Sequence, residues 1–194
     1  MKRLSLYLFL ILFTLQTPSQ ADDIRDFQIE GMSIGNSLLD YFSKDEIENR
    51  IITYYFKKKF GVILFEDKHF EVYEAIQIHY KPKDDKYIIY GIDGNLYFTN
   101  NMEECYKKKI EIVKELNAIF KDAKIINKKK SHEADKTGDS KHDITGFRFN
   151  KGGYISVDCT DWSTKLNSEG WNDELKVSII SKIFDNFINN EAYE

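Results

Sequence analysis

The longest helical pattern covers residues 101–123, where apolar side chains recur every three or four positions among charged ones. Its apolar stripe consists of Met102, Cys105, Tyr106, Ile110, Val113, Leu116, Ile119 and Phe120. Asn100 or Asn101 is placed to cap the helix, and Glu103 and Glu104 put negative charge in its first turn, where the helix dipole favours it. The pattern predicts a long amphipathic helix whose apolar face must pack against another element.

Strand-like patterns of alternating or short apolar runs flank this helix on both sides. They cover 60–66, 73–81, 87–98, 144–150, 154–162 and 174–180. Short helices are predicted after Ser33 and after Ser43, and a closing helix over 181–194. The short links between strands predict antiparallel pairing. We therefore expect an α+β fold with an antiparallel sheet of about six strands and the long helix on one face, in an order compatible with two helix-plus-three-strand units.

The first 21 residues have the pattern of a signal peptide. Lys2 and Arg3 precede an apolar run over 4–15, and Ser19 and Ala21 are the small residues expected before a cleavage site. The run is shorter than the roughly 20 residues of a membrane-spanning helix. We predict a signal peptide over 1–21, one α+β domain over 22–194, no membrane span after cleavage, and a periplasmic or secreted location.

Charge and motifs narrow the classes of function. The formal net charge is −4 at pH 7, and removal of Lys2 and Arg3 with the leader makes it more negative, which argues against nucleic acid as a partner. The chain contains no G-x-S-x-G, H-E-x-x-H, P-loop or G-x-G-x-x-G motif. No catalytic residue and no cofactor are predicted.

The two cysteines are expected to form a disulfide. Cys105 lies on the apolar stripe of the long helix. Cys159 shares a strand face with Ile155 and Val157, opposite the face that carries Asp158, so it should be buried too. Export and an even cysteine count favour a bond between them. Two buried free thiols are the alternative.

The polar segment 127–143 contains the candidate metal ligands His132, Asp139 and His142. Imidazole and carboxylate groups suit zinc or another divalent ion. Their spacing matches no established ligand pattern, and the segment has no apolar periodicity. We therefore predict a solvated surface loop in preference to a metal site.

A second candidate site includes Asp161, Trp162 and Trp171, which could form a sugar-binding or hydrolytic patch. Asp158 and Asp161 differ in strand parity and should point to opposite sides, which weakens a carboxylate pair. Packing of both tryptophans is the preferred interpretation. His79 alternates with apolar neighbours and is predicted to be an exposed surface histidine.

The chain resembles a family of small, uncharacterised exported bacterial proteins. The similarity lies in DFQIEGMSIGNSLLDYFS (26–43), AIQIHYK (75–81), EECYKK (103–108), ISVDCTDWS (155–163) and FDNFINNEAY (184–193). The resemblance implies no activity, because none is assigned to that family. The element order is also similar to outer-membrane assembly lipoprotein and β-lactamase-inhibitor-like modules, although this chain lacks the lipidated cysteine of the lipoproteins.

These observations lead to two hypotheses about function. The first is a non-enzymatic exported protein that binds another protein or an envelope component through its sheet or loops. The second is a metal-dependent or carboxylate-based hydrolase that acts on an envelope substrate and uses the 132–143 or 158–171 region.

Overall fold

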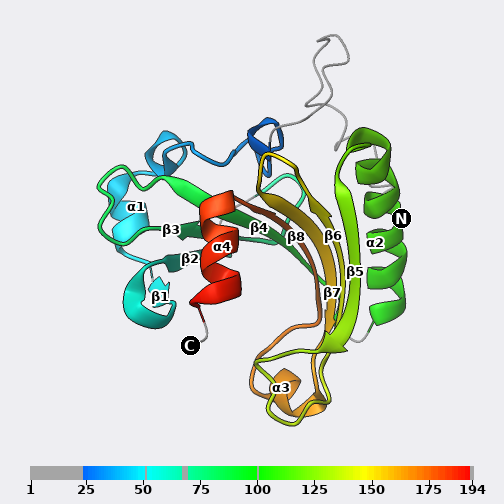
Figure 1. Cartoon of the computed structure of the whole chain (residues 1–194). Helices are drawn as coiled ribbons and strands as arrows, with labels where there is room; N and C mark the ends of the chain where they lie inside the picture. Colours follow the sequence, from blue (N-terminus) through cyan, green and yellow to red (C-terminus); the bar gives the residue numbers. More distant parts are fainter. Residues whose placement is uncertain (1–23, 51, 67–69, 100, 193–194) are drawn as a thin grey trace.

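The computed structural model describes residues 24–50, 52–66, 70–99 and 101–192; the predicted signal peptide lies outside them. Within these ranges eight strands form one antiparallel sheet, with the order β1-β2-β3-β4-β8-β7-β6-β5 (Figure 1). The strands are β1 (Ile52–Tyr54), β2 (Gly61–Phe65), β3 (Ala75–Tyr80), β4 (Ile89–Tyr97), β5 (Lys124–Ser131), β6 (Lys141–Arg148), β7 (Tyr154–Asp161) and β8 (Glu174–Ile180). The helices are α1 (Lys44–Glu48), α2 (Met102–Ile119), α3 (Thr164–Ser168) and α4 (Lys182–Asn190), with 3-10 turns at η2 (Ile24–Asp26), η3 (Leu38–Asp40) and η4 (Phe56–Lys58).

The sheet is built from two meanders of four strands, each followed by a helix. Strands β1 to β4 pair in sequence order and precede α2, and β5 to β8 pair in the same way and precede α4. The meanders join where β4 pairs with β8. The α+β class and the antiparallel pairing are confirmed. The sheet has eight strands where about six were expected, and each unit has four strands and not three, because β1 and β5 also join the sheet.

One face of the sheet carries the main hydrophobic core. Cross-strand rows of apolar side chains run through both meanders, as the strand registers show. The longest contains Ile63, Ile78, Ile92, Ile179, Ile155 and Phe147, each fully buried. Directly opposed residues on antiparallel strands share a face, so this row forms a continuous surface for other elements to cover. We call it the core face.

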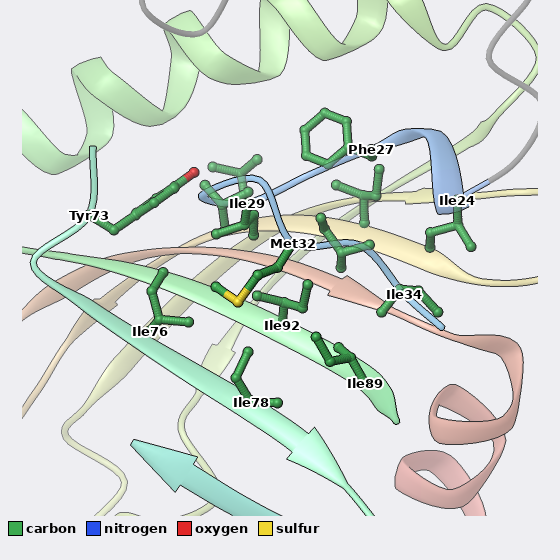
Figure 2. Packing of buried hydrophobic residues seen from close by; sticks show 14 of the residues in the cluster. Ile24, Phe27, Ile29, Met32, Ile34, Tyr73, Ile76, Ile78, Ile89 and Ile92 are labelled. Carbon is green, nitrogen blue, oxygen red and sulfur yellow. The ribbon is translucent and has the colours of Figure 1, made fainter. Parts of the chain in front are cut away.

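In the described part of the chain, the core face is covered by α2 and by the N-terminal segment from η2 to α1. Helix α2 packs on β7 and β8. The segment that begins at η2 covers the strands of the first meander, where Ile29 and Met32 are buried against Ile76 and Ile92 (Figure 2). Figure 1 shows the sheet curving around α4 on one side, with α2 against the other side. None of the described helices is long and apolar enough to cross a membrane.

The buried side of α2 differs from the predicted stripe. Its buried residues are Cys105, Lys109, Ile112 and Leu116, whereas Ile110 is 68% exposed. These four residues are separated by four, three and four positions, as expected for one side of a helix, but one of them is a lysine. The Lys109 ammonium donates to the carboxylate and to the main-chain carbonyl of Asp143, at 2.6 and 2.8 Å, and this pairing permits its burial.

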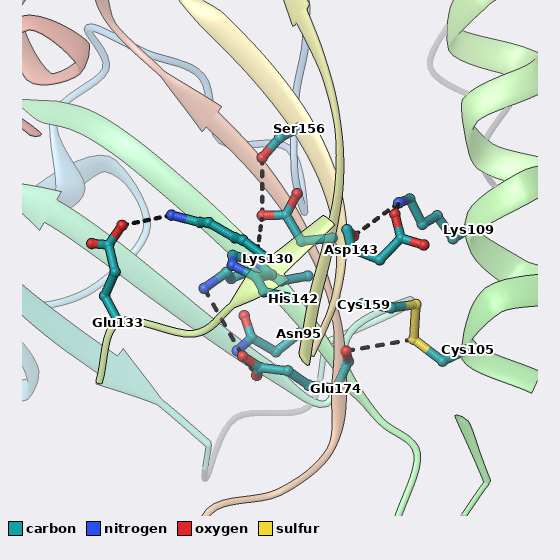
Figure 3. A network of polar contacts seen from close by, with 12 residues as sticks. Asn95, Cys105, Lys109, Lys130, Glu133, His142, Asp143, Ser156, Cys159 and Glu174 are labelled. Carbon is teal, nitrogen blue, oxygen red and sulfur yellow. Dashed lines mark hydrogen bonds and ion pairs between the residues drawn. A yellow bond between two sulfur atoms is a disulfide. The ribbon is translucent and has the colours of Figure 1, made fainter. Parts of the chain in front are cut away.

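The predicted disulfide is present. Cys105 and Cys159 are bonded, with 6.2 Å between their Cα atoms, and both are fully buried. The bond links the first turns of α2 to the core face of β7 (Figure 3). The N-cap of α2 is Asn101, whose side chain accepts from the Glu104 amide. The helix is therefore fixed at its N-terminal end by a cap and by a covalent bond.

Candidate functional site

The second face of the sheet is polar although much of it is buried. The strand registers place Asp93, Ser178 and Ser156 in one cross-strand row and Asn95, Lys176 and Asp158 in the next. A third row contains Tyr97, Glu174, Thr160 and His142. The buried side chains of these rows are Asp93, Asn95, Ser156, Asp158, Thr160 and Ser178. Polar groups are rarely buried without specific partners, so this face needs a further explanation.

Helix α4 closes one end of the polar face. Its Phe184 is 2% exposed and stacks on the imidazole of His79, with 4.5 Å between ring centroids. Gly91 on β4 permits this approach, because an added Cβ would lie 2.8 Å from His79 and 3.0 Å from Phe184. The prediction that His79 is an exposed histidine is therefore wrong: it is 4% exposed, since a helix distant in sequence covers its strand.

His79 and Asp93 form a buried pair at this closed end. The distance from His79 Nε2 to Asp93 Oδ2 is 2.9 Å, and the Tyr55 hydroxyl lies 3.3 Å from Nδ1. Burial alone would raise the pKa of Asp93, but His79 and Lys176 hold it below its usual range. Helix α4 covers the His79–Asp93 pair, so the pair contributes to the scaffold. A ligand could reach the polar face only at another place.

The opposite end is bounded by the β5–β6 connection. The predicted long polar loop over 127–143 is wrong in extent, because β5 and β6 occupy both its ends and leave only a turn. Asp135 fixes that turn by accepting hydrogen bonds from the main-chain and hydroxyl groups of Thr137 and Ser140. These bonds hold the pKa of Asp135 well below its usual range. The turn is therefore a fixed wall of the site.

Two tryptophans lie beside this turn. Trp162 follows β7 and is 6% exposed, and its ring centroid lies 4.3 Å from that of His132. Trp171 packs edge-on against Trp162 at 4.6 Å but remains 44% exposed. Burial, together with His142 and Lys176, lowers the pKa of His132 to about 4, so its imidazole is neutral at pH 7.

The end of α3 determines where Trp171 lies. Gly170 has a φ of +97°, its amide donates to Asn167 and the Trp171 amide donates to Leu166. This pair of hydrogen bonds is a Schellman motif, which requires a left-handed residue that glycine adopts without strain. The main chain that carries the exposed indole is thus held in a defined place on the wall of the site.

These groups surround a pocket of about 400 Å³ at the open end of the polar face. Its lining includes Gln77, Asn95, Tyr97, Trp171, Glu174 and Lys176, and we call it the Trp171 pocket. Asn95 Nδ2 donates to Glu174 Oε2 at 2.7 Å across the β4–β8 pair, and Figure 3 shows these two side chains pointing toward each other. The volume lies within the roughly 300–1,000 Å³ of small-molecule sites.

Several polar atoms of the polar face are buried without a hydrogen-bond partner, and one of them belongs to Asn95, which lines the pocket. They are Asn95 Oδ1, Asp158 Oδ1, Thr160 Oγ1 and His142 Nε2. His142 Nε2 does lie 3.6 Å from Asp158 Oδ2, which is close enough for electrostatic attraction but too far for a good hydrogen bond. Four such atoms on one face are unusual, because buried polar atoms are normally satisfied.

The structure brings together only some of the candidate residues from the sequence. His132 and His142 are neighbours, with 5.0 Å between ring centroids, and Trp162 and Trp171 lie beside them. Asp139 is exposed on the turn, and no group of three metal-ligating side chains occurs among the described residues. Asp161 has the strand parity of the core face, as predicted, and does not join Trp162 and Trp171.

Sequence reasoning missed Asn95, Glu174 and Lys176, which line the pocket. The available signal was the alternation of polar residues on three adjoining strands, but the same alternation describes a face exposed to water. Coverage of that face by α4 and by the β5–β6 turn depends on contacts between segments far apart in sequence, which strand periodicity does not encode.

A larger hollow of about 730 Å³ lies between α2 and strands β5 and β6. Three of its charged groups already satisfy one another, since Asp143 pairs with Lys109 at 2.6 Å and with Lys129 at 3.1 Å, and Lys114 is exposed to water. The Trp171 pocket instead combines an exposed indole with incompletely bonded polar groups. We therefore regard the smaller pocket as the candidate site.

Replacement of Glu174 tests whether its buried carboxylate in the pocket lowers the stability of the protein. Burial raises the pKa of Glu174, against the opposing effects of Lys176 and Asn95. A carboxyl group whose pKa is raised by folding stabilises the folded protein at a pH below its unfolded-state pKa. This stabilisation is lost as the pH rises through its folded-state pKa. We expect Glu174→Gln to increase the free energy of unfolding at pH 7, and the gain to shrink toward pH 4, in urea titrations.

The control for this experiment is Glu111→Gln on the exposed side of α2, which should change stability little at either pH. A lower stability of the Glu174→Gln protein at pH 7 would show instead that the buried carboxylate supports the fold.

Comparison with known proteins gave no match: no protein-family model, curated protein or solved structure is significantly similar to the chain.

Proposed function

We propose that this chain is an exported binding protein that holds a small polar component of the cell envelope in the Trp171 pocket. The observation that carries the proposal is the buried polar face, which has several unsatisfied atoms, one of them Asn95 Oδ1 in the lining of a pocket with an exposed indole. Polar groups that are buried without partners reduce stability, so their retention favours a role in recognition.

The leader pattern and the disulfide support the exported location. Residues 1–21 have the charged, apolar and small-residue regions of a signal peptide. Disulfides such as Cys105–Cys159 form and persist mainly in oxidising compartments, which include the periplasm and the extracellular space. A partner in the envelope follows from that location.

The test is native mass spectrometry of the protein after incubation with a low-molecular-mass filtrate of envelope extract from the cells that make it. We expect a reproducible adduct with the wild-type protein. Gln77→Trp should abolish the adduct by filling the pocket, whereas Gln77→Asn leaves it open and should retain the adduct. Absence of an adduct, or an adduct that survives Gln77→Trp, would contradict the proposal.

A carboxylate-based hydrolase is the second candidate. Glu66 and Glu174 both line the pocket, and burial raises the pKa of Glu174, as in a general acid. The same mass measurement separates the two functions. A binding protein returns its ligand unchanged, whereas a hydrolase returns fragments that have gained one water molecule, and Glu174→Gln should prevent their formation.

A further inference from the structure

We propose that the ligand of the Trp171 pocket is a saccharide whose ring stacks on the Trp171 indole while its hydroxyl groups bond Asn95 and Glu174. This inference rests on the proposed function and specifies its ligand class. Three properties of the pocket carry it: the exposed indole, the mixture of hydrogen-bonding groups and the balance of charge.

The indole provides a flat apolar surface beside polar groups. Trp171 is 44% exposed, although the neighbouring Trp162 is 6% exposed. The Schellman motif of α3 fixes the main chain of Trp171, and the edge-on contact with Trp162 orients its ring. An aromatic face carries partial negative charge, which attracts the polarised C–H bonds of a pyranose ring. A fixed indole loses little conformational entropy when a ring stacks on it.

The hydrogen-bonding groups of the pocket suit a ligand that donates to Asn95 and Glu174 and is tolerated beside Lys176. Asn95 Oδ1 is a buried acceptor without a donor, and Glu174 is an acceptor already engaged by Asn95 Nδ2. Lys176 in the same pocket has only donors and already pairs with Glu174 Oε1 at 3.9 Å. A sugar hydroxyl serves both kinds of group. An ammonium ligand could satisfy only the acceptors and would be repelled by Lys176.

The charge of the pocket disfavours anions. Among the residues that the structure describes, the lining contains Glu66, Glu169 and Glu174 and one cation, Lys176, and His132 is neutral at pH 7. A phosphate or carboxylate ligand would therefore meet net repulsion. A neutral polyhydroxylated ring agrees with the indole, with the mixed hydrogen-bonding groups and with the acidic surplus.

The test is binding of the full mature protein to an array of neutral and amino oligosaccharides, followed by calorimetric titration with the best-bound sugar. We expect Trp171→Ala to weaken binding at least tenfold, which corresponds to about 1.4 kcal/mol, and Trp171→Phe to weaken it less. Tyr54→Ala is the matched control, because Tyr54 is 43% exposed on β1 and does not line the pocket, so affinity should be unchanged.

Failure to bind any sugar on the array, or equal affinity of wild-type and Trp171→Ala proteins, would overturn the saccharide assignment. Spermidine is titrated in parallel, so that failure of the saccharide assignment can be distinguished from failure of the proposed function. Spermidine binding that Gln77→Trp removes, without sugar binding, would reject the saccharide and leave a functional pocket. If neither spermidine nor any sugar binds, and no adduct appears in the mass spectrum, the pocket is rejected as a binding site.

Discussion

Removal of the Cys105–Cys159 bond should lower the free energy of unfolding by about 4 kcal/mol in the chain-entropy model, given a sequence separation of 54 residues. The bond fixes α2 to the sheet at buried positions, so its loss also removes a constraint on the main core. Urea unfolding of the wild-type protein with and without reductant measures the effect.

The double variant Cys105→Ala, Cys159→Ala provides the control for this experiment. Its stability should approach that of the reduced wild-type protein and should not respond to reductant. An unfolding midpoint of the wild-type protein that reductant leaves unchanged, with reduction confirmed by alkylation, would show that α2 is held by packing alone.

Phe184→Ala should destabilise the protein by about 3–5 kcal/mol, the usual range for a buried phenylalanine. Phe184 packs on His79 and on Phe60, with ring centroids 4.5 and 4.9 Å apart, and thereby attaches α4 to the polar face. Truncation leaves a cavity over the His79–Asp93 pair as well as removing these contacts. Thermal and urea unfolding measure the loss.

Ile183→Ala is a matched control on the same helix, because Ile183 is 55% exposed and its truncation should change stability by only about 0.5 kcal/mol. If Phe184→Ala were no more destabilising than Ile183→Ala, α4 would not be the element that closes this end of the sheet.

Local pattern predicted much of the scaffold. Alternation along β7 placed Cys159 on the buried side, and this placement made the disulfide predictable together with the helical stripe. The Ser43 capping box of α1 is also present, with Glu46 bonded back to Ser43. These features depend on residues close in sequence, which is why the sequence indicates them.

Two of the errors arose where charged residues occupy structural positions. Strand β5 contains four lysines, at 124 and 128–130, and forms the last strand of the sheet, where lysine is common because one edge faces water. Lys109 concealed the true buried side of α2 in the same way. Hydrophobic periodicity detects neither case. Strand β5 is explained by its position at the edge of the sheet, and Lys109 by its ion pair with Asp143.

The candidate site was predicted only at its rim. His132, His142, Trp162 and Trp171 were candidates from residue chemistry, and the structure brings them together. The interior of the pocket comes from the pairing of β4 with β8, which joins the two meanders across 79 positions between Asn95 and Glu174. A pairing at that sequence separation leaves no local signal.

The most direct test of the central claim, that the polar face binds a ligand in the Trp171 pocket, is nuclear magnetic resonance with the envelope filtrate. The chain has two tryptophans, so two indole N–H signals report on the pocket wall. We predict that the filtrate shifts the Trp171 indole and the Asn95 side-chain amide and leaves the signals of exposed α2 residues unchanged. Shifts confined to α2, or none at all, would contradict the account.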